Sequence, residues 1–426
     1  VGKNTQPAGP IHPAWKILFA CCLVQFGGLG VLSNSIGVFF PAVCASLHCT
    51  TAQISLHVTI RGFAMMAALP LASRLISRYP SRLVLTPAAV VLVCSVGSMA
   101  FFSKLWQWYV ASVFYGFAGG FLFLNMSPIL LTNWFFKRRG FAVGMAMAFA
   151  GLGGIVMNPL GNALIESLGW RAAYLIFAGI GAACILPFTL FVLKRRPEDA
   201  GVRPYGAEQS GSAFTTQAEG RACTRKRPAG TLAKDGVLWV FLGVVTIAVF
   251  ETVFIYHFPG FALSVGLTTA VGSMMSSASM AGNLASKFFL GWLNDRAGSK
   301  RAFLLGAVFT MTGIMLIQVF QRSPELLIAG SFLYGASMSM PSVLVPLLIL
   351  DLFDRGAYTS VLSLSTMTVA AMGGMGVALV GWIYDVSGGF TAAFWMAQAA
   401  CAVGVCLLMA AFRMRNRRCR RREIEK

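Results

Sequence analysis

The chain has 426 residues, of which 57% are hydrophobic and only 11% are charged, and its mean hydropathy is +0.72. Soluble proteins normally carry about 25% charged residues, so one soluble core cannot hold this much apolar surface, and the surplus must face lipid. The net charge of +20 would suit nucleic acid, but the basic residues cluster between apolar runs, as topology signals of membrane proteins do, and we expect no nucleic-acid partner.

Twelve apolar runs follow one another along the chain. Each is close to the length of about 20 residues that a helix needs to cross a bilayer. Backbone groups in lipid must be satisfied within their own segment, so all twelve are predicted to be helices. The first run is too long for the core of a signal peptide and is expected to be retained. The runs cover residues 15–40, 54–75, 83–103, 106–131, 141–166, 171–193, 237–262, 269–293, 301–320, 325–350, 356–382 and 391–412.

The loops between these runs differ in basic charge. The even-numbered loops and the two chain ends hold 29 of the 34 Lys and Arg residues, whereas the odd-numbered loops hold only Lys104, Arg171 and Arg322. Lys and Arg are enriched in the cytoplasmic loops of membrane proteins. The split therefore predicts an even number of spans, with both termini in the cytoplasm and the protein in the cell (inner) membrane.

The longest polar stretch, at residues 194–236, lies midway along the chain and is predicted to be a cytoplasmic linker. It divides the chain into an N-terminal six-helix bundle at 1–193 and a C-terminal six-helix bundle at 237–426, which ends in a basic cytoplasmic tail. The fold class is therefore predicted to be an all-α membrane protein with twelve transmembrane helices.

The two halves of the chain are similar in sequence. A shift of 218 residues places Pro41 on Pro259, and Thr50–Ala52 on Thr268–Ala270. Each half begins on the same side and holds an even number of spans. The halves are therefore predicted to be parallel repeats related by an axis along the membrane normal.

The turn between runs eight and nine reads GWLNDRAGSKR, starting at Gly291. A tight turn needs a glycine at Gly298, and the acid Asp295 and the bases Arg296 and Lys300 lie around it. This pattern resembles the loop signature of the major facilitator superfamily. The resemblance implies a twelve-helix transporter in which such charges contact neighbouring helix ends and help to hold one conformational state.

The corresponding turn of the first half keeps Arg78 and Arg82 but has Ser73, Ser77 and Pro80 where the signature has Gly, Asp and Gly. A charge-based lock in the first half therefore lacks its acid. The charges of both turns could instead act only as topology signals, and the sequence leaves this alternative open.

Three further segments resemble bacterial relatives of the monocarboxylate transporters and the oxalate:formate antiporter. They are Asn133–Gly144 (NWFFKRRGFAVG), Gly169–Tyr174 (GWRAAY) and Arg196–Gly206 (RPEDAGVRPYG). The resemblance implies a cation in helix eight, one turn before the loop signature, that binds the carboxylate of the substrate, and Lys287 stands at that place. A second cation, which some relatives carry in helix eleven, is missing here, because no charged residue lies between Tyr358 and Tyr384.

Polar residues inside membrane runs are candidates for binding the substrate, because burying charge in a bilayer is costly. Lys287 and Asn283, one turn apart on the same helix face, are predicted to bind an anion, and Arg61 in run two is a further candidate. Lys287 could instead reach the headgroups, and Arg61 could be a structural ion-pair partner. Asn34 and Asn125 could hydrogen-bond the substrate or simply join helices.

Glu251 is the only carboxyl group deep inside a run. A carboxyl group in low-dielectric surroundings can carry a proton, so Glu251 is the predicted proton-coupling group, with His257 as a second titratable candidate. Glu251 could instead be a fixed counter-ion, and His257 a packing residue. The ten Cys residues lack the spacing of a metal site, and no metal or cofactor is expected.

Together these features predict a secondary active transporter that moves a small organic anion by alternating access, with a monocarboxylate as the expected substrate. Transport would be coupled to protons or to anion exchange. Proton-coupled efflux of a hydrophobic compound is the alternative among transporters, and a polytopic membrane sensor is the alternative of another class. We do not expect an enzyme, because no catalytic constellation is present. We expect a monomer in the lipid bilayer whose partners are the substrate and a coupling proton.

Overall fold

The computed structural model describes residues 12–136, 138–193, 197, 202, 204–206, 236–353 and 357–424. Its secondary structure in this part of the chain is helical, apart from an isolated β-bridge between Phe135 and Tyr205. Most of the predicted linker at 194–236 lies outside the described residues.

The first half is built from spans that contain short irregular helical turns. Its elements are α1 (Pro13–Gln25), η1 (Phe26–Asn34), η2 (Ile36–Phe39), α2 (Phe40–Leu47), α3 (Thr51–Arg78), α4 (Ser81–Ser98), η3 (Met99–Phe101), α5 (Leu105–Gly119), η4 (Gly120–Asn125), α6 (Met126–Trp134), α7 (Arg139–Pro187) and η5 (Phe188–Val192).

The second half follows the same plan. Its elements are α10 (Gly236–Phe250), η7 (Glu251–Tyr256), α11 (Phe258–Ser264), α12 (Thr269–Ala297), α13 (Ser299–Val319), α14 (Pro324–Tyr334), α15 (Ala336–Ser339), η8 (Met340–Leu344), α16 (Val345–Leu352), α17 (Tyr358–Ser387) and α18 (Thr391–Ile424).

Ten helical stretches of the described chain are long and apolar enough to cross a membrane. One of them, Gly140–Val192, is 53 residues long and reverses direction at Gly169, whose φ of 81° and ψ of 160° are not helical, so it forms two spans. α12 has 29 residues and is not among the ten, because polar residues occupy much of it. Counting both, the described chain has twelve helical spans, and the predicted all-α membrane fold is confirmed.

The first span is longer than the sequence indicates. It runs from Pro13 to Leu47, whereas the predicted run ends at residue 40. Pro41 follows the predicted end directly but does not stop the helix, because it lies in the first turn of α2, where a missing N–H removes no helical hydrogen bond. The irregular turns η1 and η2 precede α2 and allow the chain to continue.

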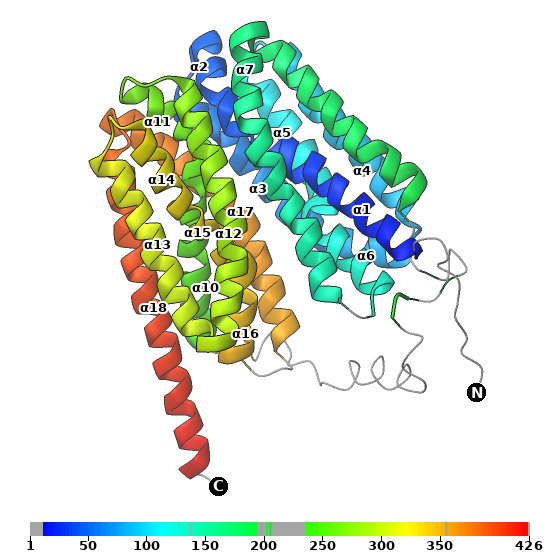
Figure 1. Ribbon diagram of the computed structural model, residues 1–426, viewed down its shortest axis with the longest axis vertical. Helices are drawn as coiled ribbons and strands as arrows, with labels where there is room; N and C mark the ends of the chain where they lie inside the picture. Colours follow the sequence, from blue (N-terminus) through cyan, green and yellow to red (C-terminus); the bar gives the residue numbers. More distant parts are fainter. Residues whose placement is uncertain are drawn as a thin grey trace, which may run out of the picture.

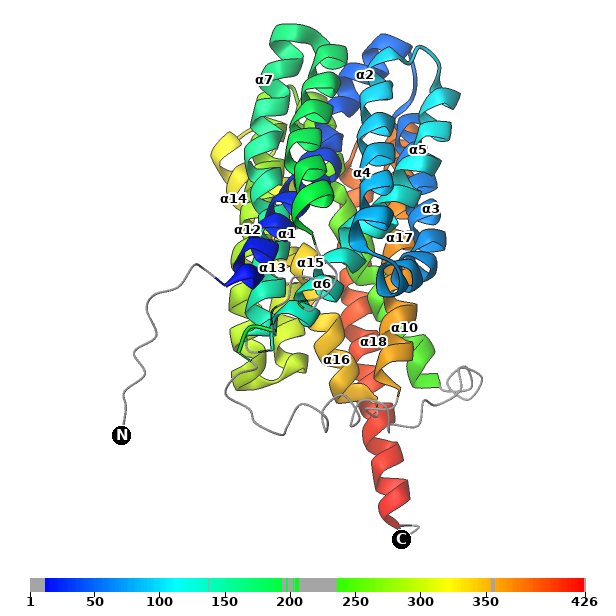
Figure 2. The same cartoon turned by 90° about the vertical axis from the view of Figure 1, so that its right-hand side faces the viewer.

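The bundle has two ends, which we name by the segments that lie there. The terminus end carries the start of α1, the end of α18 and the turn at Gly298, and the distal end carries the turns at 48–50, 264–268 and 388–390. Figure 1 shows the two halves side by side and diverging toward the terminus end, and Figure 2 shows α18 extending beyond the bundle at that end.

The two halves meet mainly through two helix pairs, α3 with α17 and α7 with α12. Within the described chain, the hydrogen bonds between the halves lie toward the distal end. Thr59 Oγ1 donates a hydrogen bond to Gly374 O at 2.8 Å, and Ser277 Oγ donates to Ile155 O at 2.9 Å. One cluster of buried apolar side chains accordingly runs from the first half into the distal part of the second, whereas a separate cluster fills the rest of the second half.

Glycines allow α3 and α17 to cross closely. A Cβ atom added at Gly62 would lie 2.5 Å from Ala370 O, and one added at Gly374 would lie 2.8 Å from both Thr59 Cα and Val58 O. Small residues of this kind let membrane helices approach at backbone distance. The distal contact between the halves therefore depends on the absence of side chains at these positions.

The turn between α12 and α13 depends on the backbone of Gly298, as the sequence predicts. Its φ of 85° and ψ of 159° lie in a region that essentially only glycine adopts. Replacing Gly298 with alanine is expected to lower the free energy of unfolding by about 1–3 kcal/mol, which thermal denaturation in detergent would measure.

Gly291, in the same motif, supplies the matched control. It lies inside α12, and a Cβ atom added there would meet nothing within 4 Å. Alanine at Gly291 should be neutral or stabilise the helix by up to about 1 kcal/mol. An equal loss of stability in both variants would contradict the conformational explanation.

Candidate functional site

A cavity of about 160 Å³ lies between the two halves. It is lined from the first half by residues of η1, α3 and η4, and from the second by residues of η7 and α17. We call it the central cavity. Its lining residues are Leu29, Ser33, Asn34, Val58, Arg61, Gly62, Met65, Phe123, Leu124, Thr252, Val253, Tyr256, Val369, Ala370, Gly373 and Gly374.

Arg61 is the charged side chain that lines this cavity. Its Nη1 donates to Ser33 Oγ and to Tyr115 Oη, both at 3.3 Å, and its Nη2 lies 3.5 Å from Tyr256 Oη. The guanidinium also lies over the Tyr115 ring, 5.1 Å from its centroid. All these partners are neutral, and in the described chain no carboxylate lies within ion-pair distance of Arg61.

These contacts leave part of the guanidinium unused. A guanidinium has five N–H donors, and only three hydrogen bonds are formed here. Tyr115 is held in place because its own hydroxyl donates to Leu32 O at 2.7 Å. The cavity therefore presents a fixed cation with free donors, which is an arrangement suited to a carboxylate.

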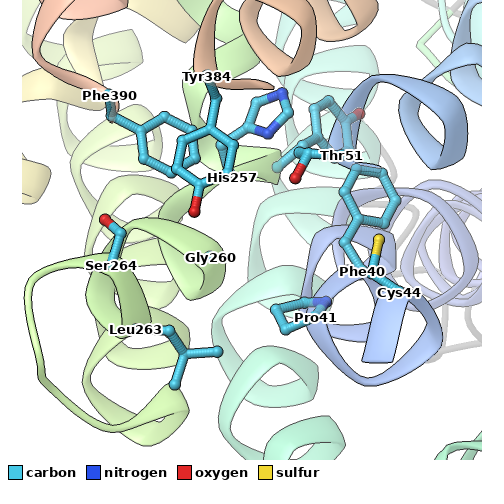
Figure 3. Close-up of a pocket in the computed structure, with 11 residues that line it drawn as sticks. Phe40, Pro41, Cys44, Thr51, His257, Gly260, Leu263, Ser264, Tyr384 and Phe390 are labelled. Atoms are coloured by element: carbon cyan, nitrogen blue, oxygen red, sulfur yellow. The ribbon is translucent and has the colours of Figure 1, made fainter. Parts of the chain in front are cut away.

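A second cavity, of about 280 Å³, lies at the distal end of the molecule. Figure 3 shows Phe40 and Pro41 of the first half facing Tyr384 and Phe390 of the second across it. Tyr256 lines both this distal cavity and the central one. It therefore forms part of the wall between them, at the point where its hydroxyl group meets Arg61.

Lys287 and Asn283 lie outside the residues that line the central cavity. Lys287 is partly exposed and forms no hydrogen bond or ion pair within the described chain, while Asn283 is buried with its Oδ1 unpartnered. Met280, which adjoins Gly154 of α7, precedes Lys287 by seven residues. Two helical turns separate them, so Lys287 lies on the face of α12 that meets the other half, about 10 Å nearer the terminus end.

Glu251 lies inside the second half rather than at the interface. It is 1% exposed, the thiol of Cys401 on α18 lies beside its carboxyl group, and its Oε2 has no hydrogen-bond partner. Its backbone carbonyl accepts a hydrogen bond from Tyr334 Oη at 2.6 Å. The structure thus places Glu251 away from Arg61 and the central cavity.

His257 is buried, and its Nε2 lies 3.0 Å from Val377 O of α17. It lines the distal cavity. Asn34 lines the central cavity, and its Nδ2 donates to Ala150 O of α7 at 3.2 Å, so it joins two helices of the first half. The side chain of Asn125 lies outside the described part of the structure.

The residues of the two loop motifs lie at the terminus end. Arg82 Nη2 donates to Phe191 O at 2.9 Å, and Arg296 lies over the Trp292 ring at 4.5 Å. Lys300 lies 5.9 Å from the Phe412 ring centroid, and the carboxylate of Asp295 lies 3.4 Å from Asn294 Nδ2. Each of these contacts is local to one half, as is that of Arg78 with the Tyr79 ring at 6.0 Å.

Sequence reasoning missed the tyrosines that surround Arg61. Tyr115 could have been found from the sequence, because the internal repeat makes it the equivalent of Tyr334. Both hydroxyl groups donate to backbone carbonyls inside their own half. Tyr256 carried no signal beyond being a polar aromatic residue in an apolar run. Within the described chain, no group of three or more His, Cys, Asp or Glu could hold a metal ion.

Comparison with known families supports the fold that the helices build. A model of the Major Facilitator Superfamily matches residues 18–285 and 240–426. The chain belongs to the Major Facilitator Superfamily. It is therefore a multi-pass membrane transporter. Its relatives and structural neighbours are transporters rather than enzymes, which confirms the prediction that the chain is not an enzyme.

Two similar relatives of this superfamily member are monocarboxylate transporters. It is 26% identical to monocarboxylate transporter 11 of Homo sapiens over 408 residues, covering 91% of this chain and 81% of the relative. It is 22% identical to monocarboxylate transporter 13 of Bos taurus, covering 93% and 88%. The predicted resemblance to monocarboxylate transporters within the major facilitator superfamily is confirmed.

Solved structures of other superfamily members share the fold. A nucleoside transporter gives a TM-score of 0.73 at 14% identity and covers 94% of this chain and 100% of its own. A D-xylose–proton symporter gives 0.70 at 14% identity, covering 93% and 96%. At this identity the likeness concerns the fold alone.

Proposed function

We propose that this transporter carries a small organic anion, and that the anion is a monocarboxylate held by Arg61. The observation that carries the proposal is the cation of Arg61 in the cavity between the halves, bonded only to neutral groups. A buried charge favours a partner of opposite sign, because an unpaired charge in low-dielectric surroundings is costly. The names of the relatives as monocarboxylate transporters agree with this substrate class.

Lys287 and Asn283 supply a second point of contact on the route to Arg61. Both lie on α12, where the halves diverge toward the terminus end, and the Oδ1 of Asn283 has no partner. We propose that Lys287 attracts the anion and that Asn283 receives a hydroxyl or amide donor of the substrate. The central cavity at Arg61, of about 160 Å³, then admits only a small molecule.

The proposal extends the sequence-based topology. Both termini and the 194–236 linker lie on the cytoplasmic side of the cell (inner) membrane, and the 1–193 and 237–426 halves rock about the central cavity. The basic loops of the terminus end support this orientation. We propose that the transporter acts as a monomer, because the central cavity is complete within one chain.

Uptake of labelled monocarboxylates and oxalate into proteoliposomes tests the substrate class. Saturable uptake of a monocarboxylate is expected, with a KM that rises about 3- to 10-fold in Lys287→Gln, because exposed charges attract ligands by about 1 kcal/mol or somewhat more. Arg301→Gln, which removes a cation from the neighbouring turn, should leave KM unchanged. Uptake of no acid by folded protein would overturn the proposal and favour efflux of a hydrophobic compound.

Glu251 is our proposed proton-coupling residue. Its buried carboxyl group has one unpartnered oxygen and lies in a half that moves during transport. Replacing it with glutamine should abolish the stimulation of uptake by an inward proton gradient while leaving exchange of labelled for unlabelled substrate intact. Unchanged stimulation in Glu251→Gln would assign coupling elsewhere or indicate an anion exchanger.

A further inference from the structure

Two carboxylates join the halves at the distal end, each at the first turn of a helix that belongs to the other half. Asp385, near the end of α17, accepts hydrogen bonds from the backbone N–H groups of Thr51 at 3.2 Å and Ala52 at 2.8 Å. These N–H groups begin α3 and have no partner within their own helix. The contact is therefore between the second half and the first.

In the other contact, the first half supplies the acid and the second half supplies the helix. Glu166 of α7, in the first half, accepts a hydrogen bond from Thr269 Oγ1 at 3.1 Å, at the start of α12 in the second half. Asn162, one turn earlier on α7, donates its Nδ2 to the same oxygen of Glu166 at 2.8 Å. This bond orients the carboxylate toward α12.

The internal repeat relates the two contacts. Thr51 and Thr269 are 218 residues apart, which is the offset between the halves, and Glu166 and Asp385 are 219 apart. Both acids are therefore equivalent residues near the distal ends of equivalent helices. The two contacts lie on the two helix pairs through which the halves meet, α3 with α17 and α7 with α12.

We propose that Asp385 and Glu166 form a twofold distal lock, which holds the distal end closed and must release both contacts when that end opens. Each contact places a negative charge at a helix N-terminus, where the helix dipole stabilises it. Neither can persist once the halves separate, because its two partners belong to different rigid bodies. The acids are positioning residues for the transport cycle, and their role does not depend on which substrate is carried.

Hydrogen–deuterium exchange of the full chain in lipid nanodiscs tests the lock. The peptides to follow cover the first turns of α3 and α12. Asp385→Ala and Glu166→Ala should each raise exchange in both peptides by about 2- to 5-fold, the range expected for one carboxylate at a helix N-terminus. The double variant should show roughly the product of the single effects.

The decisive reading is the effect across the interface. Glu166 makes no described contact with α3, so faster exchange at the start of α3 in Glu166→Ala reports opening of the whole distal end. Glu325→Ala provides the control, because Glu325 is an exposed acid in the first turn of α14 at the same end, without a described contact to the first half. In Glu325→Ala, exchange of the peptides at the starts of α3 and α12 should match the wild type.

Two further readings separate a gate from a structural role. The melting temperature should be unchanged, since both acids are exposed, and Asp385→Glu should restore slow exchange. If Glu166→Ala speeds exchange only at α12, the acids are merely local helix caps and the lock is refuted. A lower melting temperature with faster exchange throughout the chain would also refute it.

Discussion

Replacing Arg61 with glutamine is expected to weaken binding of the transported carboxylate by about 10- to 100-fold. A hydrogen bond to a charged group contributes about 1.5–3 kcal/mol, and each 1.4 kcal/mol is about a factor of ten in affinity. The variant should still fold, because Tyr115 keeps its bond to Leu32 O and Ser33 has only a long contact to Arg61. The concentration dependence of uptake into proteoliposomes measures the effect.

Two companion variants make this result specific. Arg61→Lys keeps the positive charge but loses the planar pair of donors, so its KM should lie between those of the wild type and Arg61→Gln. Arg322→Gln removes an exposed arginine at the distal end and should have no effect. A wild-type KM in Arg61→Gln would remove Arg61 from the binding site.

Replacing Gly374 with alanine is expected to shift the transporter toward a state that is open at the distal end. The added methyl group would lie 2.8 Å from Thr59 Cα and Val58 O, and backbone atoms of another helix cannot turn aside as a side-chain tip can. Overpacking of this kind costs about 1–3 kcal/mol. The ratio of distal-closed to distal-open molecules should therefore fall by about 5- to 150-fold.

Distances between spin labels at Ser167 and Ser387 measure this shift, because both residues are exposed at the distal end of different halves. The labels are best attached through an introduced non-natural amino acid, since Cys94 and Cys406 are exposed and would also react. Gly373→Ala is the matched control on the same helix, as its methyl group would make an ordinary 3.7 Å contact with Val249. Equal distance distributions in both variants would contradict the prediction.

The sequence predicted the spans well because lipid imposes a simple requirement on them. Apolar length identified every span, including α12 with its many polar residues, and the repeat explained why two equivalent halves form. The first span extends to Leu47, beyond the predicted end at residue 40, because Pro41 lies in the first turn of α2, where a proline is tolerated.

The sequence predicted less about which way side chains point. The sequence offered Lys287 and Arg61 as anion-binding candidates and Glu251 as the proton-coupling candidate, and of these three only Arg61 lines the central cavity. The direction of Tyr256 relative to Glu251 was harder still to predict, because η7, which covers Glu251–Tyr256, is a 3-10 helix. Its residues advance by about 120° rather than 100°, so the helical phase drifts by about 120° over six residues. Contacts between residues of different spans, such as that of Tyr256 with Arg61, leave no pattern in the sequence around either residue.

The uncompensated charge of Arg61 has an electrical consequence. When the cavity is empty, the halves move around a net positive charge, whereas a bound monoanion cancels that charge. Moving one elementary charge across the membrane changes the free energy by about 2.3 kcal/mol per 100 mV. Membrane voltage should thus bias the return of an empty carrier whose Glu251 is still protonated. A carrier that has released this proton holds a compensating negative charge at Glu251 and should return independently of voltage.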